Sequence, residues 1–249
     1  MAKGEKIILF DTTLRDGGQT RGVHFSVEDK IKLTRELDEM GFEYIEGGWP
    51  GSNPKDIHYF EEMKKIRLHH AKLSSFSSTR LKDTDPAQDK ILAELLKAET
   101  PVFTLFGKAW DMHVSESLGT SLEENLAMIH STVAYLKPRG DEVVYDAEHY
   151  FDGYKANPEY ALQTIKAAAD AGADWIVLAD TNGGALPEEV RIATRPPWLR
   201  WTHRSVSTPM MTAICLWPTP LWRLNWEPRW FREPSMVWGN AAAMRICAA

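Results

Sequence analysis

The sequence predicts an α/β protein, a (β/α)₈ (TIM) barrel that is incomplete because six strands are expected and the tail beyond them is irregular. Three observations predict this class. Short apolar runs alternate with helical segments over residues 5–192, the rhythm of parallel βαβ units. The 249 residues are about the size of one such barrel. Polar residues follow most of the apolar runs, as at the catalytic end of these barrels.

The elements follow in chain order. The run Ile-Ile-Leu-Phe at 7–10 is the first expected strand. Ser26 with Asp29 three residues later fits a capping box, and the helix that begins there carries apolar residues at helical spacing and ends at Gly41. Further strands are expected at 44–46, 72–77, 102–106, 142–145 and 175–178, and further helices at 56–65, 86–98, 122–137 and 158–171.

Composition sets broad bounds on function. The first residues show no secretory signal, and no apolar run approaches the roughly 20 residues of a membrane span. The net charge of −6 argues mildly against a nucleic-acid partner. A cytoplasmic, soluble, globular protein with neither a nucleic-acid nor a membrane partner is therefore expected.

The stretch at 11–19, Asp-Thr-Thr-Leu-Arg-Asp-Gly-Gly-Gln, directly follows the first expected strand. Arg15 and Asp16 place a fixed cation beside a hard oxygen ligand, a pairing that can polarise a carbonyl next to a divalent metal. The two glycines allow a tight turn and a close approach to a ligand. A surface turn with an Arg–Asp pair explains this stretch equally well by itself.

Other polar residues share this placement. Glu46 ends the second expected strand, and Lys108 follows the fourth. Asp146 and Glu148 follow the fifth, and Asp180 and Thr181 follow the sixth. A helix cap or a surface charge is the more common role for any one of these residues. Their common position at the carboxyl ends of the strands indicates an active site.

Several segments resemble one family in order along residues 5–192. The stretch at 11–19 resembles the signature of the metal-dependent Claisen-condensing synthases, which include the isopropylmalate, homocitrate and citramalate synthases. Within that family, four segments look like the citramalate synthases: YIEGGWPGSNPKD at 44–56, LFGKAWD at 105–111, YDAEH at 145–149 and DTNGG at 180–184.

The resemblance implies an acyltransferase that condenses acetyl-CoA with pyruvate in isoleucine/leucine-type branched-chain amino-acid biosynthesis. It implies a divalent metal (Mg, Mn or Zn) that chelates the 2-oxo acid, with Asp16 as one ligand. Arg15 would stabilise the oxyanion on the keto oxygen, and Thr181 would hold the pyruvate carboxylate. Gln19, Glu46 and Glu148 would line or order the site. The group that removes the acetyl methyl proton is not assigned, and a homodimer is the usual assembly in the family.

The family also has a His-x-His pair on the seventh strand, as metal ligands, and an Asn-Gly-x-Gly-Glu-Arg segment near the eighth. This sequence has neither, so the lone His203 is not carried over as a ligand. From about Ala193 the composition changes, since seven of the ten Trp and seven of the fourteen Pro lie beyond Ile192. We therefore divide the chain into a partial catalytic barrel at 1–192 and a tail at 193–249.

A frameshift explains this tail. If the tail is back-translated, shifted codons can be read that join the last base of each codon to the first two bases of the next. In this shifted frame the segment VSTPMMTAI can encode IHAHDDSD. In the same frame, REPSMVWGNAAAMRICAA permits GTINGMGERCGNANLCS. Both missing motifs return in order. The hypothesis is an out-of-frame tail on a citramalate synthase gene, with a barrel that lacks two strands, has open sheet edges and does not turn over.

Two alternatives remain open from sequence. The chain could be a sibling synthase of the isopropylmalate or homocitrate type that uses another 2-oxo acid. It could also be a non-catalytic protein whose Trp-, Arg- and Pro-rich tail binds a partner.

Overall fold

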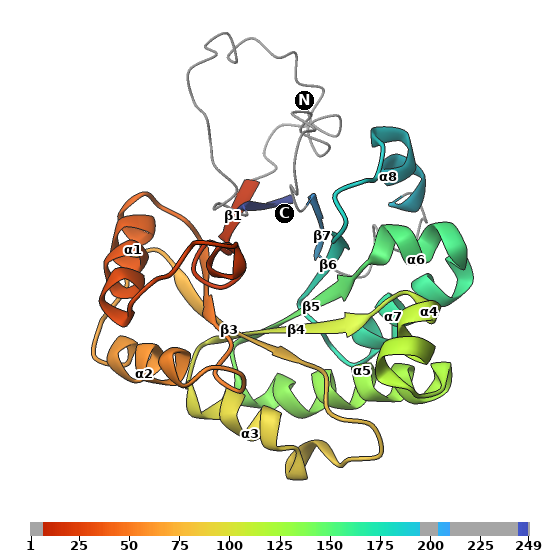
Figure 1. Ribbon diagram of the computed structural model, residues 1–249, viewed down its shortest axis with the longest axis horizontal. Coiled ribbons are helices and arrows are strands. Elements are labelled where there is room, and N and C mark those ends of the chain that lie inside the picture. The colour runs from red at the N-terminus through yellow and green to blue at the C-terminus, as the bar shows by residue number, and fades with distance from the viewer. Residues whose placement is uncertain (1–6, 195–203, 210–243, 249) are drawn as a thin grey trace, which may run out of the picture.

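The computed structural model describes residues 7–194, 204–209 and 244–248, with only the backbone described for the last two segments. Strands in the centre are surrounded by an arc of helices (Figure 1). The strands are β1 (Ile7–Asp11), β2 (Tyr44–Gly48), β3 (Lys72–Ser78), β4 (Val102–Lys108), β5 (Glu142–Glu148), β6 (Trp175–Asp180), β7 (Arg204–Pro209) and β8 (Met244–Ala248). The six predicted strands are confirmed, and each pairs in parallel with the next.

The tail supplies two strands that the sequence did not predict. Strand β7 continues the parallel order beside β6, with Trp175 opposite Arg204. Strand β8 runs antiparallel to both β1 and β7. Because it pairs with both, the sheet β1 to β8 closes into a barrel. The expectation of open sheet edges is therefore wrong for the backbone. The antiparallel β8 nevertheless departs from the all-parallel repeat of a (β/α)₈ barrel. His203 lies outside the described residues.

The longer helices lie where the sequence predicted them. They are α1 (Val27–Glu39), α2 (Pro54–Met63), α3 (Lys90–Lys97), α5 (Leu122–Leu136) and α7 (Pro158–Asp170). The capping box at α1 is formed, since the Asp29 N–H donates to Ser26 Oγ and the Ser26 N–H donates to the Asp29 carboxylate. The expected helix at 86–98 is instead a 3₁₀ turn, Pro86–Gln88, followed by α3, because the Asp89 side chain caps α3.

Short helices follow the carboxyl ends of three strands and were not predicted. They are α4 (Asp111–His113), which continues into a π-helical turn at Val114–Leu118, α6 (Tyr150–Ala156) and α8 (Pro187–Ala193). Helices of three to seven residues are too short for an apolar period to be recognised in the sequence. They build the loops that surround the candidate site.

The interior of the barrel is aromatic at the amino ends of the strands. The rings of Phe10 and Tyr44 stack with centroids 5.4 Å apart, and Trp175 meets Tyr44 edge-on. The Glu142 carboxylate accepts hydrogen bonds from the Tyr44 hydroxyl at 2.6 Å and from the Trp175 indole at 3.0 Å. Within the described residues, this layer fills the barrel interior beside the first residues of β2, β5 and β6.

A second apolar layer lies between the sheet and the helices. On the β4–β6 side it contains Leu105, Ile129, Tyr145 and Ile165, all fully buried. Burial of each such side chain stabilises the fold by about 1.5–3 kcal/mol before the entropy of ordering is counted. Within the described residues, no helix is long and apolar enough to span a membrane.

Candidate active site

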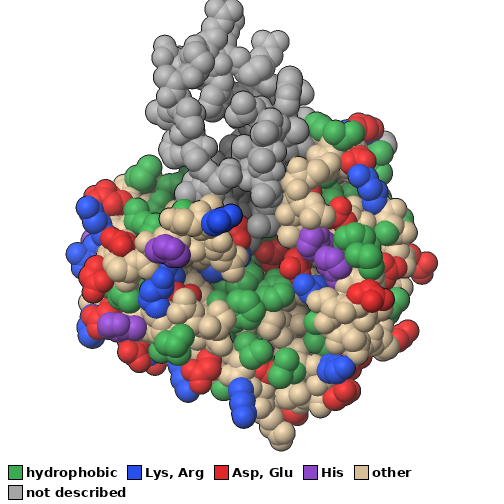
Figure 2. Space-filling view, in the orientation of Figure 1, with side chains coloured by type: hydrophobic (Ala, Val, Ile, Leu, Met, Phe, Trp, Pro, Cys, Tyr) green, Lys and Arg blue, Asp and Glu red, His purple; other side chains and the backbone are tan. Residues whose placement is uncertain are grey.

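The predicted polar residues do collect at the carboxyl ends of the strands. Arg15 and Asp16 lie in the loop after β1, and Glu46 lies within β2. Glu148 ends β5, and Thr181 follows β6. On the face shown in Figure 2, acidic and histidine side chains gather beside a central hydrophobic area. The contacts arrange the predicted residues in two groups.

The first group surrounds the Arg15 guanidinium. Arg15 Nε donates to Glu46 Oε2 at 2.6 Å, and Arg15 Nη1 donates to Asp16 Oδ1 at 2.9 Å. The Glu46 side chain is fully buried and that of Arg15 is 8% exposed. The backbone N–H groups of residues 15, 16 and 17 all approach the Thr12 carbonyl, which holds the loop tightly. The cation therefore has a fixed direction before any ligand arrives.

Aromatic rings form the wall beside this cation. The Arg15 guanidinium carbon lies 3.9 Å from the centroid of the Phe76 ring. Phe76 in turn stacks on Phe106, with centroids 5.3 Å apart, and Trp49 meets both rings edge-on. A cation against an aromatic face is stabilised electrostatically, and more strongly when water is excluded.

A buried ion pair supports the Trp49 loop from behind. Lys30 of α1 donates to Asp56 Oδ1 at 2.5 Å and to the Gly47 carbonyl at 2.9 Å. Asp56 Oδ2 accepts the Trp49 N–H at 2.9 Å. A Cβ at Gly48 would lie 2.6 Å from the Asp56 carboxylate, so only glycine allows this approach. Burial lowers the pKa of Lys30, while the Asp56 carboxylate opposes that shift.

The second group lies at the ends of β4, β5 and β6. Lys108 forms an ion pair with the Glu148 carboxylate across the register pair of β4 and β5. Thr181 Oγ1 accepts the backbone N–H of His149 at 2.9 Å. Because that bond uses an oxygen lone pair, the Thr181 hydroxyl can still donate its proton to a ligand.

Gln19 is placed differently from the other predicted residues. Its residue is exposed, and its backbone N–H donates to the Asp16 carbonyl in the 3₁₀ turn Gly17–Gln19. Its side chain makes no hydrogen bond within the described residues. The role expected for Gln19 stays a prediction, as do those of the other site residues.

Two carboxyl groups of the site region have raised pKa values. Burial raises the pKa of Asp11, against hydrogen bonds from Thr13, and Glu46 adds a like charge. Burial likewise raises the pKa of Asp180, although its carboxylate accepts backbone N–H groups of the following loop. Both shifts arise because a low-dielectric interior disfavours the charged form.

The donor set does not complete a metal centre within the described residues. Asp16 is the one predicted ligand, and its carboxylate already pairs with Arg15. No group of three or more His, Cys, Asp or Glu side chains is placed to hold a metal in the part of the chain whose side chains are described. Residues 7–194 therefore do not fit a divalent metal by themselves.

Several residues of the site were missed from sequence. Phe76 and the Lys30–Asp56 pair carry no local signal, because their roles depend on contacts between separate elements. His149 and Asp152 also belong here, since the His149 ring approaches Asp152 at 3.1 Å. His149 stands next to Glu148 in the predicted segment 145–149, and this proximity was the available signal.

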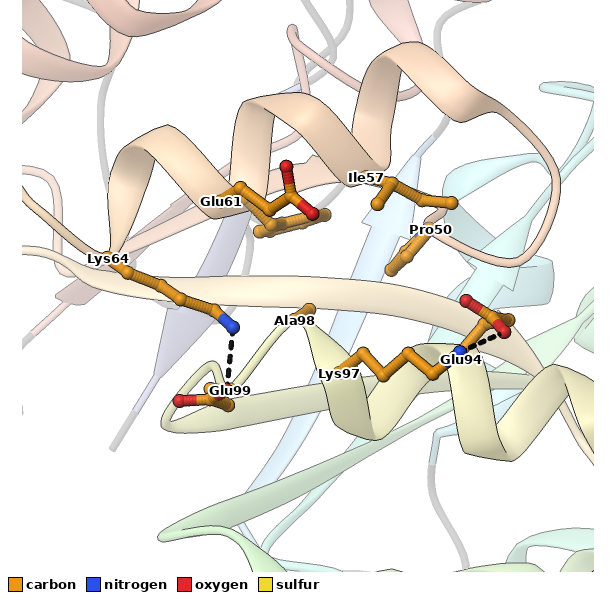
Figure 3. A pocket seen from close by; sticks show the side chains of 9 residues that line it. Pro50, Ile57, Glu61, Lys64, Glu94, Lys97, Ala98 and Glu99 are labelled. Carbon is orange, nitrogen blue, oxygen red and sulfur yellow. Dashed lines mark hydrogen bonds and ion pairs between the residues drawn. The ribbon is translucent and has the colours of Figure 1, made fainter.

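One depression of about 270 Å³ lies away from this site, between α2 and α3 (Figure 3). Two ion pairs border it, Lys64 with Glu99 and Lys97 with Glu94, each at 2.6 Å. Four of its charged side chains thus pair with one another, Glu61 also lines it, and among these residues there is no arrangement of catalytic groups.

Known proteins resemble this chain most over its barrel residues. The profile of the HMGL-like family matches residues 6–206. The chain is 56% identical over 191 residues to the (R)-citramalate synthase of Aquifex aeolicus, which covers 77% of this chain and 36% of that enzyme. It is 57% identical over 182 residues to the (R)-citramalate synthase of Geobacter sulfurreducens, covering 73% and 34%. The match therefore spans about a third of the length of these curated relatives.

Less similar proteins also match this chain. The chain is 32% identical over 185 residues to the 2-isopropylmalate synthase of Listeria innocua, covering 74% of this chain and 35% of that enzyme. Among solved structures, the HMG-CoA lyase of Bacillus subtilis superposes with a TM-score of 0.66 at 19% identity, covering 84% of this chain and 71% of the lyase. That likeness shows the barrel fold alone.

Proposed function

The chain belongs to the HMGL-like family, among the isopropylmalate, homocitrate and citramalate synthases, and we propose that residues 1–192 are the first part of a citramalate synthase. The reaction is the condensation of acetyl-CoA with pyruvate in isoleucine/leucine-type biosynthesis. One observation carries this choice: identity to the curated (R)-citramalate synthases is far higher than identity to the isopropylmalate synthases. We propose further that the protein is cytoplasmic and uses no membrane or nucleic-acid partner.

Arg15 is the group that stabilises developing negative charge. When the enol carbon of the acetyl group attacks the keto carbon of pyruvate, charge moves to the keto oxygen. Glu46 and Asp16 hold the guanidinium, and Phe76 covers one of its faces, so the cation needs no rearrangement during the step. A preorganised donor at such an oxyanion typically contributes a factor of about 10²–10³ in rate.

Thr181 and Glu148 hold the substrates in place. The Thr181 hydroxyl donates to the pyruvate carboxylate while its oxygen lone pair accepts the His149 N–H. Glu148, paired with Lys108, orders the opposite side of the opening. Glu46 acts through Arg15, and Gln19, in the turn after β1, lines the site.

The bound divalent metal would polarise the 2-oxo acid, and Asp16 would be one of its ligands. The described residues do not complete that ligand set, so we propose that this chain is not competent as it stands. The missing His-x-His pair is recovered by the shifted reading of residues 206–214, which begin within β7. We propose that residues 193–249 are an out-of-frame product and that the intact gene encodes the missing ligands.

The nucleotide sequence across the codons for Val190 to Arg200 tests the frameshift. An inserted or deleted base that restores both motifs supports it, and an uninterrupted frame refutes it. The activity is tested by incubating the frame-restored protein and the present chain with acetyl-CoA, pyruvate and a divalent metal. Citramalate from the restored protein alone is the expected result, and citramalate from the present chain contradicts the proposed inactivity.

A further inference from the structure

His149 has an unusual backbone conformation at the edge of the site. It follows β5 with φ 55° and ψ 32°, in the left-handed region that few residues other than glycine adopt. Histidine tolerates this region better than most residues, but the conformation still has an energetic cost. The bend directs the His149 N–H to Thr181 Oγ1 and begins α6. Strain of this kind is retained where the surrounding structure requires it.

The His149 ring is fixed by a chain of polar contacts. Nδ1 lies 3.1 Å from Asp152 Oδ2, and the same oxygen accepts the side-chain N–H of Asn182 at 2.9 Å. Because an ionised carboxylate only accepts hydrogen bonds, this contact requires the proton on Nδ1. Nε2 is then an acceptor, and within the described residues no group hydrogen-bonds to it. The side chain is 14% exposed, so the ring is covered but reachable.

Charged and titratable groups near the His149 and His113 rings come from four elements: Lys108 from β4, His113 from α4, Glu148 from β5 and Asp152 from α6. The His113 ring meets the His149 ring edge-on, with centroids 4.6 Å apart. Burial and the neighbouring His149 and Lys108 lower the pKa of His113, although Glu148 and Asp152 oppose that shift. Glu148 is compensated by Lys108, and Asp152 lies in the first turn of α6.

We propose that His149 is the group that accepts the acetyl methyl proton, with Asp152 and Asn182 as positioning residues that hold its Nε2 unprotonated. The inference rests on the proposed condensation. The proton moves from the methyl carbon to Nε2, the C–H pair becomes the carbon–carbon double bond, and the carbonyl pair moves to the thioester oxygen. The enolate carbon then bonds to the keto carbon of pyruvate, as the thioester carbonyl re-forms and the keto π pair moves to the keto oxygen; water later cleaves the thioester and releases CoA. The resulting alkoxide takes the proton back from His149.

The tautomer is measured on the full chain by ¹⁵N NMR of histidine-labelled protein, with the His149→Asn variant used to assign the resonance. Asparagine tolerates the left-handed conformation, so the backbone is kept. We expect Nε2 far downfield, as an unprotonated nitrogen, and Nδ1 upfield. The Asp152→Ala variant should move the proton to Nε2, and Asn182→Ala should do so in part. Asp170→Ala, which removes an exposed carboxylate paired with Lys166, should change nothing.

A wild-type Nε2–H tautomer, or one that Asp152→Ala and Asn182→Ala leave unchanged, overturns the positioning. In the frame-restored enzyme, His149→Asn should abolish exchange of acetyl-CoA methyl protons with deuterated water, while Asp170→Ala retains it. An active restored enzyme whose His149→Asn variant exchanges at the wild-type rate overturns the base assignment and leaves the proposed function standing. A restored wild type without citramalate activity refutes the proposed function itself, whatever the tautomer.

Discussion

The guanidinium carbon of Arg15 lies 3.9 Å from the centroid of the Phe76 ring, in a site where Phe76 is 6% exposed. The loop after β1 and the middle of β3 are thereby coupled through a cation and a ring. Glu46 and Asp16 hold the guanidinium against the ring.

This contact predicts a measurable coupling energy. In a double-mutant cycle of Arg15→Met and Phe76→Leu, we expect an interaction of about 1–2 kcal/mol, since the pair is largely desolvated. Chemical denaturation of the four proteins measures it. The matched control is the more exposed stacked pair Arg139 and Tyr135, for which about 0.5 kcal/mol is expected. Additive effects at Arg15 and Phe76 would contradict the coupling.

Breaking the Lys30–Asp56 pair is expected to destabilise the fold strongly. Asp56→Asn leaves a buried ammonium without its counter-charge, which should lower the free energy of unfolding by about 3–5 kcal/mol. Asp170→Asn, in an exposed pair with Lys166, should cost less than about 1 kcal/mol. The double variant Lys30→Met with Asp56→Leu should be more stable than Asp56→Asn. If it is less stable, burial of the unpaired charge is not the cause.

The raised pKa of Asp11 predicts a loss of stability as the pH rises through the acidic range. Its pKa is raised in the folded state, chiefly by burial, so the folded protein binds more protons there than the unfolded chain. The stabilising contribution is complete below the unfolded pKa of 3.8 and is lost as the pH rises through the folded value. Asp11→Asn should remove this component from denaturation curves measured from pH 3 to pH 7. An unchanged pH profile would refute it.

The lowered pKa of Asp38 predicts the opposite dependence of stability on pH. Although burial acts to raise its pKa, hydrogen bonds from the backbone N–H groups of residues 69–71 outweigh it, and the net shift is downward. Its stabilisation is present above the unfolded pKa of 3.8 and lost as the pH falls through the folded value. Asp38→Asn should cost about 1.5–3 kcal/mol at pH 7, measured by urea unfolding, and less at pH 3. Glu39→Gln, an exposed neighbour, is the control.

Substitutions at Arg15 and Thr181 should affect different kinetic constants in the frame-restored enzyme. Arg15→Lys replaces a fixed planar cation by a point charge and should lower kcat by about 10²–10³. Thr181→Val keeps the shape but removes the hydroxyl donor, so the KM for pyruvate should rise more than kcat falls. Steady-state assays with pyruvate and with longer 2-oxo acids measure both effects. They also show which acceptor the enzyme prefers.

The sequence by itself determined the order of the first six strands and the side of the sheet that carries polar groups. Both follow from local patterns: apolar runs such as 143–145 form buried strands, and residues after them, such as Glu148 and Thr181, fall at one end of a parallel sheet. The family motifs added the proposed chemistry. The short helices α4, α6 and α8 were not predicted, because three to seven residues are too few to show the helical periodicity of apolar side chains.

Only the tertiary structure decided which of these polar groups act together. It placed Arg15 between Glu46 and Phe76, residues 31 and 61 positions away, and it joined Thr181 to His149 across two loops. It also showed two strands in the tail, of which the antiparallel β8 closes the barrel against β1. Such contacts depend on how separate elements pack. A sequence pattern reports the local preference of each element but not the partner that its side chains meet.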